Sequence, residues 1–344
     1  MNKFRTIDLF CGGGGLSQGL KDAGFDVVAA YDWWQPAIDF YNQNFKDHKA
    51  YKLDLSDVDA SVDRLTKWEP QIIVGGPPCQ DFSSAGKRDE NGGRAELTIA
   101  YAKIVTAIHP QLFIMENVDR ALKTKTYQQA LKIFSNAGYY LTVAVLDASL
   151  CGVPQKRKRV IAVGTLKNIS SSLIEEYKKR QSNKPMTIRE YLGDSLGIDF
   201  YYRHPRSYAR RAIFSIDEPS PTIRGVNRPI PKGYEGHPGD AAPVTTKNLR
   251  PLTTKERSLI QTFPQDWEMI GSKSEIELII GNAVPVKLGE FVGKAIKSID
   301  KKEQIISETP KDIVYDIPKE DQPMYQPLMI FEQSATYKAK NKCG

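Results

Sequence analysis

The chain has 344 residues, 40% of them hydrophobic, which is enough for one large domain and a smaller one. It carries no apolar run of about 18 residues that would predict a transmembrane helix. A strand pattern begins so close to the first residue that we expect no signal peptide. The net charge of +7 is compatible with a polyanionic partner but does not require one. The four cysteines lack metal-ligand spacing and a secreted disulfide framework, so we expect reduced thiols in a cytoplasmic protein.

Residues 4–10 alternate as a first strand should, and the glycine-rich turn 11–15 follows them. Apolar residues then keep helical spacing from Leu16 to Ala23. A strand, a glycine turn and a helix in this order predict the start of a nucleotide-binding βαβ unit, in which the backbone passes close to a ligand at the helix N-terminus. The next strand ends at Asp32, where a carboxylate is placed to hold ribose hydroxyls.

The glycine turn does not by itself identify the cofactor, because the glycine spacing over residues 13–19 also fits a nicotinamide-dependent dehydrogenase. Trp33 and Trp34 follow the acidic strand end, and one of these indoles can stack on an adenine while the other belongs to the core. Asp54 stands at the end of a third short strand, and we expect Ser56 to cap the helix that comes next.

The central feature of the sequence is a cysteine on a stiff loop. Residues 72–74 predict a buried strand, and the Gly-Gly-Pro-Pro sequence of residues 75–78 ends it before Cys79. In open α/β sheets this carboxyl edge binds ligands. A free cysteine is most often a small buried hydrophobe, but the proline mount and the polar neighbours favour a nucleophile. The polar residues 82–93 predict a mobile loop.

A carboxylate follows a second buried strand. Residues 112–115 are fully apolar and deliver Glu116 and Asn117 at a position that repeats that of Cys79, on what we expect to be the neighbouring strand. An exposed loop acid is the alternative. Further along, four consecutive basic residues, 156–159, enter another apolar strand, which is costly unless anions or acids meet them. This run predicts either a solvated edge or a contact to phosphate or base.

Regular patterns fade between about residues 166 and 250. Residues 201–232 hold seven Arg and Lys against two acids, with Tyr, Pro and Gly between them, as expected of a small loop-rich domain that faces nucleic acid. Thr253 and Glu256 have the spacing of a capping box, and a final amphipathic helix runs to residue 299. The tail beyond it is predicted to be poorly ordered or laid over the surface.

Together these segments resemble the cytosine-C5 DNA methyltransferases, in the compact form typical of bacterial modification enzymes, from about residue 4 to 299. The resemblance implies an α/β, Rossmann-like S-adenosylmethionine-dependent methyltransferase fold with a smaller loop-rich target-recognition domain. It divides the chain into a catalytic and cofactor-binding domain (1–165), a target-recognition domain (166–249), a return to the catalytic domain (250–299) and a tail (300–344). The residues that match the family's cofactor motifs are Phe10, Gly12, Gly14, Gly15, Leu16, Asp32, Trp33, Asp54, Leu55, Pro77, Asn282, Ala283 and Val284.

The resemblance also implies the reaction. S-adenosylmethionine would supply the methyl group and leave as S-adenosylhomocysteine, with no metal, and Cys79 would add to C6 of a cytosine flipped out of duplex DNA. Glu116 would donate to N3 of the ring and Arg159 would contact O2. The predicted catalytic residues are Cys79, Glu116, Asn117, Gln155, Arg157 and Arg159. The predicted DNA contacts are Ser83, Arg94, Arg203, Arg206, Arg210, Arg211, Arg224 and Arg228. A monomer is expected, with a cognate restriction endonuclease as a candidate partner.

Three alternatives stay open at this point. A nicotinamide-dependent oxidoreductase fits the glycine turn, but it gives Cys79 and Glu116 no role. A tRNA cytosine methyltransferase shares the chemistry, whereas the long basic segment after residue 166 favours duplex DNA. A non-catalytic DNA-binding module is disfavoured by the complete catalytic set.

Overall fold

The computed structural model describes residues 4–78, 95–205, 207, 209–300 and 313–318. Four predicted site residues therefore lie outside the described residues, together with the polar loop 82–93: Cys79, Ser83, Arg94 and Arg206. In the part of the chain that is described, no helix is long and apolar enough to cross a membrane.

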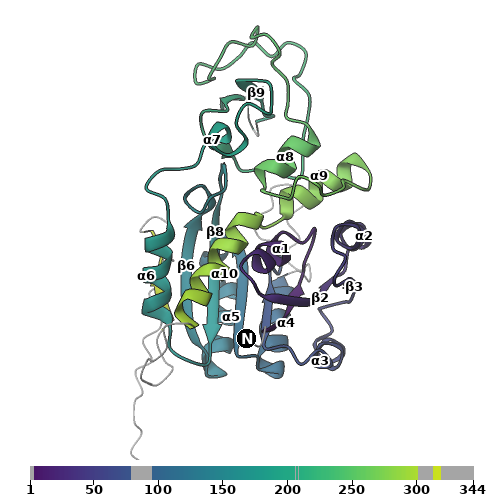
Figure 1. The fold of residues 1–344 in the computed structure, drawn as a ribbon, viewed down its shortest axis with the longest axis vertical. Helices are drawn as coiled ribbons and strands as arrows, with labels where there is room; N and C mark the ends of the chain where they lie inside the picture. The colour runs from purple at the N-terminus through teal and green to yellow at the C-terminus, as the bar shows by residue number, and fades with distance from the viewer. Residues whose placement is uncertain (1–3, 79–94, 206, 208, 301–312, 319–344) are drawn as a thin grey trace, which may run out of the picture.

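Eight strands of the described residues form one sheet (Figure 1). All neighbouring strands are parallel except β8, which is antiparallel to both β5 and β6. Strands buried on both faces read as continuous apolar runs, and the run 72–74 is buried throughout, as predicted. In spatial order the strands are β12 (Ile313–Asp316), β6 (Tyr140–Asp147), β8 (Lys158–Thr165), β5 (Leu112–Val118), β4 (Ile72–Gly75), β1 (Arg5–Leu9), β2 (Asp26–Asp32) and β3 (Ala50–Lys52).

Helices cover both faces of the sheet (Figure 1). On one face Leu20, Tyr177 and Val292 join a single apolar cluster, and on the other face Leu65 and Leu131 belong to a second one. The helices of the first face are α1 (Gly15–Asp22), α6 (Ser170–Arg180) and α10 (Val286–Asp300). Those of the second are α3 (Val58–Thr66), α4 (Ala95–Ile108) and α5 (Lys125–Asn136), and α2 (Gln35–Asn44) packs beside β2 and β3. This three-layer arrangement confirms the predicted fold class.

A second, loop-rich unit stands on the carboxyl edge of the sheet (Figure 1). This unit begins after α6. The ring of Tyr177 in α6 stacks on Phe291 of α10 at 5.8 Å, so α6 belongs to the helices that cover the sheet, although its residues fall in the segment 166–249. The elements of the second unit are α7 (Ile188–Leu192), β9 (Phe200–Tyr202), β10 (Ile213–Ser215), β11 (Ser220–Pro221), α8 (Thr254–Ile260) and α9 (Lys273–Asn282). The strand β11 pairs with β7 (Gln155–Lys156), which joins the two units.

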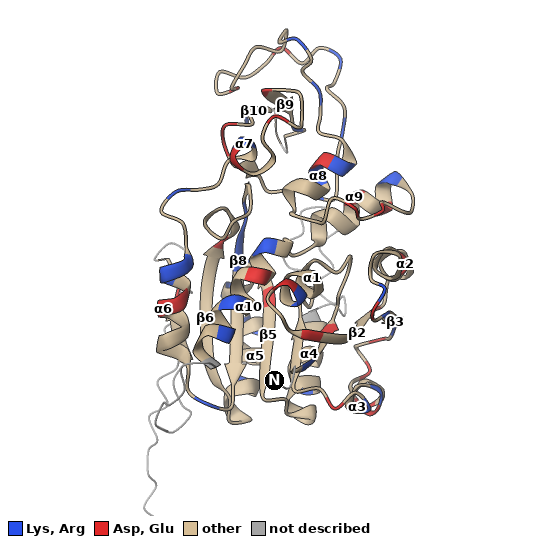
Figure 2. Cartoon of the chain, viewed as in Figure 1, with Lys and Arg blue, Asp and Glu red and all other residues tan. Residues whose placement is uncertain are grey.

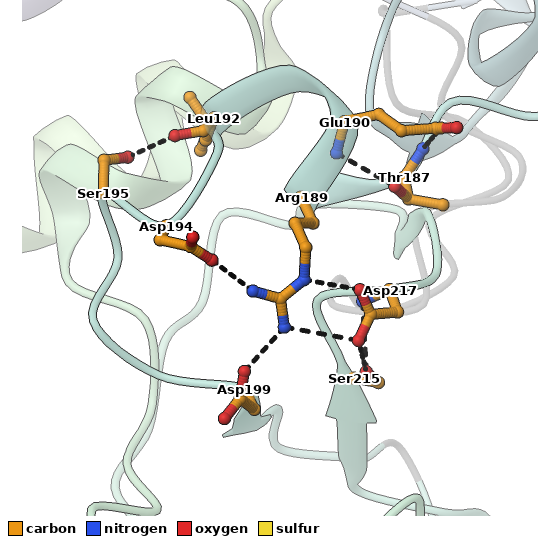
Figure 3. A network of polar contacts seen from close by, with 9 residues as sticks. All are labelled: Thr187, Arg189, Glu190, Leu192, Asp194, Ser195, Asp199, Ser215 and Asp217. Carbon is orange, nitrogen blue, oxygen red and sulfur yellow. Dashed lines mark hydrogen bonds and ion pairs between the residues drawn. The ribbon is translucent and has the colours of Figure 1, made fainter.

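One arginine ties the start of the second unit together (Figure 3). Arg189 in α7 donates from Nε to Asp217 Oδ1 and from Nη2 to Asp199 Oδ1, both at 2.6 Å, and it also pairs with Asp194. These contacts hold α7, the turn after it and the end of β10 at fixed positions. Because all three carboxylates are well exposed, each pair contributes little by itself and the shared geometry matters more.

Three local predictions can be compared with the structure. The capping box of Thr253 and Glu256 is confirmed at the start of α8. The expected cap of α3 is wrong, since Asp57 accepts from the Ala60 N–H and Ser56 bonds to Asp54 instead. The tail contains an edge strand that its composition did not predict. Residues 313–316 pair in parallel with β6, and their apolar side chains pack on the core.

Candidate active site

The register of the sheet brings the predicted motifs to one edge. Gly75 at the end of β4 lies opposite Leu9 of β1 and Met115 of β5, and all three strands run in parallel. The glycine turn and the proline loop therefore follow neighbouring strand ends, and Glu116 lies beside them near the end of β5, which runs on to Val118. The antiparallel strand β8 begins at this edge, and its Arg159 lies opposite Val118 of β5.

Glu116 and Arg159 form a buried ion pair. Glu116 is 8% exposed, and its Oε1 lies 2.8 Å from Arg159 Nε. A methyl group placed on Gly76 would come within 3.1 Å of Glu116 Oε2, so the second oxygen faces the loop that leads to Cys79. Burial raises the pKa of Glu116, and the positive charges of Arg159 and then Arg157 oppose the rise. The site thus holds a carboxyl group that is easier to protonate than an exposed one.

Asn117 holds the same loop by its backbone. Its Nδ2 donates to the carbonyl oxygen of Pro77 at 2.8 Å, and its Oδ1 accepts from the N–H of Val118 at 2.9 Å. Since Asn117 is 5% exposed, both contacts are made away from water. The strand end that carries Glu116 therefore also fixes the chain two residues before Cys79.

Arg157 contacts protein carbonyl groups instead of facing the open edge. Its Nη1 donates to Ile223 O at 3.1 Å, and its Nη2 donates to Gly281 O and Ala283 O at 3.0 Å each. The side chain is 2% exposed. The residue just before β8 is therefore tied to two segments of the second unit, the one at Ile223 and the end of α9.

Gln155 completes this junction. Its Oε1 accepts from the N–H of Ile223, and its Nε2 donates to Gln261 Oε1, both at 2.8 Å. Gly281 packs so closely on the segment after Ile223 that a methyl group there would come within 2.1 Å of the Gly225 nitrogen. We call the buried contacts of Gln155, Arg157, Ile223 and Gln261 the junction.

The glycine turn and the end of β2 form one surface. Gly12 and Gly14 take φ values of +52° and +84°, which favour glycine. Asp32 accepts from the Gly12 N–H and from the Trp34 N–H at 2.9 Å each, and burial raises the pKa of its carboxyl group. Trp33 next to it is 61% exposed. A bare turn, a carboxylate and an exposed indole together fit an adenosine-containing ligand.

The remaining predicted cofactor residues lie around this surface. A methyl group on Gly15 would come within 2.0 Å of the Val284 carbonyl oxygen, so the segment of Asn282, Ala283 and Val284 abuts the glycine turn. Asp54 is exposed, and its hydrogen bonds with Ser56 lower the pKa of its carboxyl group. A cavity of about 420 Å³ lies beside Ser56, between α3, α4 and α5. Of the other matched residues, Leu16, Leu55 and Pro77 are buried and Phe10 is partly buried.

Comparison with known proteins decides what this arrangement is. Residues 4–298 match the family described as C-5 cytosine-specific DNA methylase. The chain belongs to this family. It is 55% identical to the Type II methyltransferase M.HgiDI of Herpetosiphon aurantiacus, over 86% of this chain and 94% of that protein. It is 52% identical to the Type II methyltransferase M.HindV of Haemophilus influenzae, over 86% and 97%.

Solved structures agree on the fold. The Entamoeba histolytica methyltransferase EhMeth aligns with a TM-score of 0.66 at 17% identity, over 88% of this chain and all of that one. The S. pombe Dnmt2 methyltransferase aligns with a TM-score of 0.62 at 18% identity, over 86% and 99%. The family match and the identity to Type II methyltransferases, and not these structures, confirm the predicted family and activity: the chain is a DNA cytosine-5 methyltransferase.

The arginines that the sequence assigned to DNA divide into two groups in this methyltransferase. Arg203 donates to Thr222 O at 2.8 Å, Arg224 donates to His204 O, and Arg211 pairs with Glu218. Arg210 and Arg228 are exposed. Figure 2 shows blue segments spaced along the loops of the second unit, together with blue at the start of β8.

Sequence reasoning missed two buried polar residues near the site. Gln261, the partner of Gln155, lies 106 positions away in sequence, and no local signal points to it. Asp8 had a signal, because a carboxylate inside a strand of a parallel sheet is buried whichever face it takes, and Asp8 is 1% exposed. Within the described ranges, no three His, Cys, Asp or Glu side chains gather to hold a metal ion.

Proposed function

We propose that this methyltransferase transfers the methyl group of S-adenosylmethionine to C5 of a cytosine flipped out of duplex DNA, through a covalent adduct between Cys79 and C6. The observation that carries the proposal is the buried pair of Glu116 and Arg159 at the strand edge that leads to Cys79. C5 of cytosine is a poor nucleophile. An acid and a guanidinium placed together can stabilise the negative charge that develops on the ring when it is activated.

In the first step the Cys79 thiolate adds to C6, and the double bond shifts from C5–C6 to C4–C5, which makes C5 the nucleophilic carbon of an enamine. Negative charge then develops on N3 and O2 of the ring. Glu116 in its protonated form donates to N3, and burial favours this form because it raises the pKa of the group. Arg159 supplies positive charge at O2. Asn117 and the junction residues Gln155 and Arg157 position these groups without touching the base.

The methyl donor, when bound, supplies an electrophilic methyl group whose transfer forms the C5–CH₃ bond and returns an electron pair to sulfur. Asp32 and Trp33 would hold its adenosine part, and the turn at Gly12 and Gly14 would lie along the rest. A base then removes the C5 proton, and the thiolate leaves C6 as the double bond re-forms. The glycine turn, the exposed indole and the Val284 segment support this assignment.

We further propose that residues 201–232 of the second unit read the DNA sequence. Exposed Arg210 and Arg228 are suited to phosphate or base contacts. The high sequence identity, over most of the chain, to proteins named Type II methyltransferases supports a modification role beside a restriction endonuclease that acts on the same site. Because a single chain carries both units, we propose a monomer that acts on genomic DNA in the cytoplasm.

The test is bisulfite sequencing of DNA from cells that express the wild type or Cys79→Ser. We expect methylated cytosines in one short sequence context with the wild type and none with the variant, because a hydroxyl is far less ionised than a thiol at neutral pH. Turnover of Cys79→Ser near that of the wild type would refute the covalent mechanism. Methyl transfer to tRNA and not to duplex DNA by the purified enzyme would refute the substrate.

A further inference from the structure

Asp8 is a buried carboxyl group that the proposed reaction does not use. It lies in β1, opposite Ala30 of β2 and Val74 of β4, and it is 1% exposed. A buried carboxyl group costs stability unless hydrogen bonds compensate for the lost water. The strand would be more stable with an apolar residue at this position, so the cost calls for an explanation.

A chain of polar contacts leads from the surface to Asp8. Ser17 Oγ donates to Asp8 Oδ2 at 2.6 Å, and the Ser17 side chain lies near the Tyr41 hydroxyl, whose pKa it lowers against the effect of burial. That hydroxyl lies 2.7 Å from His48 Nε2, and His48 Nδ1 lies 3.0 Å from Asp47 at the surface. The interior carboxyl group can therefore exchange its proton along this chain.

The glycine turn is built directly on these residues. Ser17 is in the first turn of α1, where helix N–H groups have no partner within the helix, and its backbone helps to lower the pKa of Asp8 against the effect of burial. A methyl group on Gly14 would come within 2.9 Å of the Tyr41 ring. A shift of Ser17 or Tyr41 would therefore move both sides of the turn that precedes α1.

We infer that Asp8 is a positioning residue for cofactor binding, which acts through Ser17 and Tyr41 to hold the glycine turn in the shape that receives the adenosine cofactor. The inference rests on the proposed function, because it assigns the cofactor to this turn. Ionised Asp8 can accept from both the hydroxyl and the backbone N–H of Ser17, whereas protonation occupies one of its oxygens. Cofactor affinity is then coupled to the charge of Asp8.

The pH range of this coupling follows from the surroundings of Asp8. Burial raises its pKa to about 7, the bonds from Ser17 oppose the rise, and the charge of Asp32 adds to it. If the cofactor favours the ionised form, its affinity falls as the pH drops below about 7, by at most about tenfold per pH unit. The groups that face Asp8 are Ser17 of α1, Cys11 of the turn, Asp32 of β2, Tyr41 of α2 and Tyr101 of α4.

Stability depends on this group in the opposite direction. The pKa of Asp8 is raised from 3.8 to about 7, so the folded state favours the proton, and the stability from the neutral group is complete below the unfolded value. This stability is lost as the pH rises from about 4 to about 7. At pH 8 Asp8→Asn removes a buried charge, and we expect a melting temperature no lower than that of the wild type. A purely structural Asp8 predicts loss of stability and affinity together.

The experiment measures binding of S-adenosylhomocysteine by calorimetry between pH 6 and 8.5, beside thermal denaturation at pH 8. For the wild type we expect affinity to fall below pH 7. Asp8→Asn should bind about 5- to 20-fold more weakly at pH 8 and lose the pH dependence. Tyr41→Phe keeps the ring under Gly14 and should shift the midpoint of the pH dependence. The controls, Asp63→Asn on the exposed face of α3 and Tyr51→Phe, should match the wild type.

The outcomes separate the two proposals. Failure of the wild type to bind S-adenosylhomocysteine would overturn the proposed cofactor, and this inference with it. Binding by the wild type with an unchanged pH profile in both Asp8→Asn and Tyr41→Phe would overturn the inference alone. A fall in melting temperature of Asp8→Asn that accompanies its weaker binding would reduce Asp8 to a structural residue and also overturn it.

Discussion

Replacement of Glu116 by Gln tests the proposed catalysis most directly, since the amide keeps the shape of the side chain and removes its acidic proton. General acid catalysis contributes about 10²–10⁴-fold in rate, which corresponds to about 3–5 kcal/mol of transition-state stabilisation. We expect kcat to fall by this factor while the affinity for DNA changes little, because the contact to N3 strengthens only as the ring accepts charge.

The structure also predicts a cost in stability for this variant. Glu116 faces Arg159 at 2.8 Å with both side chains about a tenth exposed, so loss of the carboxylate leaves a buried guanidinium without its counter-charge. The Gln oxygen can still accept from Arg159 Nε, and we therefore expect a loss of about 1–3 kcal/mol instead of the full cost of an unpaired charge. Urea denaturation measures this term separately from turnover.

The pKa of Glu116 also predicts the direction in which kcat changes with pH. Since burial raises the pKa of Glu116, the fraction of protonated acid falls as the pH rises through that pKa, and kcat should fall on the alkaline side. Glu116→Gln should flatten this limb. The assay is single-turnover transfer of a labelled methyl group to duplex DNA at several pH values. A folded variant with kcat within about threefold of the wild type would refute the role of Glu116 as the acid.

Three further predictions concern the residues that position the site and the arginines proposed to bind DNA. Asn117→Ala should free the carbonyl that it holds and lower the single-turnover rate about tenfold, with cofactor affinity by calorimetry unchanged. Arg157→Lys should lower the free energy of unfolding in urea by about 1–3 kcal/mol, because a lysine cannot span three carbonyl groups. Arg210→Ala and Arg228→Ala should each weaken DNA binding and reduce its salt slope by about one in fluorescence titrations, if they hold phosphates. Arg211→Ala, which breaks an internal pair, should leave the salt slope unchanged.

Those parts of the fold that local patterns specify could be predicted from the sequence. The apolar runs 72–74 and 112–115 identify two buried strands, and parallel strands deliver the residues after them to one edge of the sheet. For this reason the proximity of Glu116 to the loop of Cys79 followed from sequence, and the pairing of β4 with β5 bears it out. The helix caps at Thr253 and Glu256 were equally local.

Contacts between distant segments could not be predicted in this way. The basic run 156–159 reads as a solvated edge or a DNA contact, but the two Nη atoms of Arg157 donate to carbonyl groups of residues 223, 281 and 283. Residue type alone does not reveal such partners, because any backbone carbonyl can accept from a guanidinium. The same holds for Arg203 and Arg224. Each donates at least one hydrogen bond to a backbone carbonyl inside the protein, and the sequence does not reveal these acceptors.

The pairing of Glu116 with Arg159 bears on the choice of base. Oε1 of Glu116 faces the guanidinium and Oε2 faces the loop of Cys79, so the pair can stay together while the carboxyl group turns one oxygen toward a ring. Burial raises the pKa of Glu116 and so favours the form that donates a hydrogen bond. Cytosine presents a bare N3 that accepts this hydrogen, whereas the N3–H of thymine or uracil would meet a second donor. In the proposed mechanism, the burial that favours protonated Glu116 therefore also makes the site selective for cytosine.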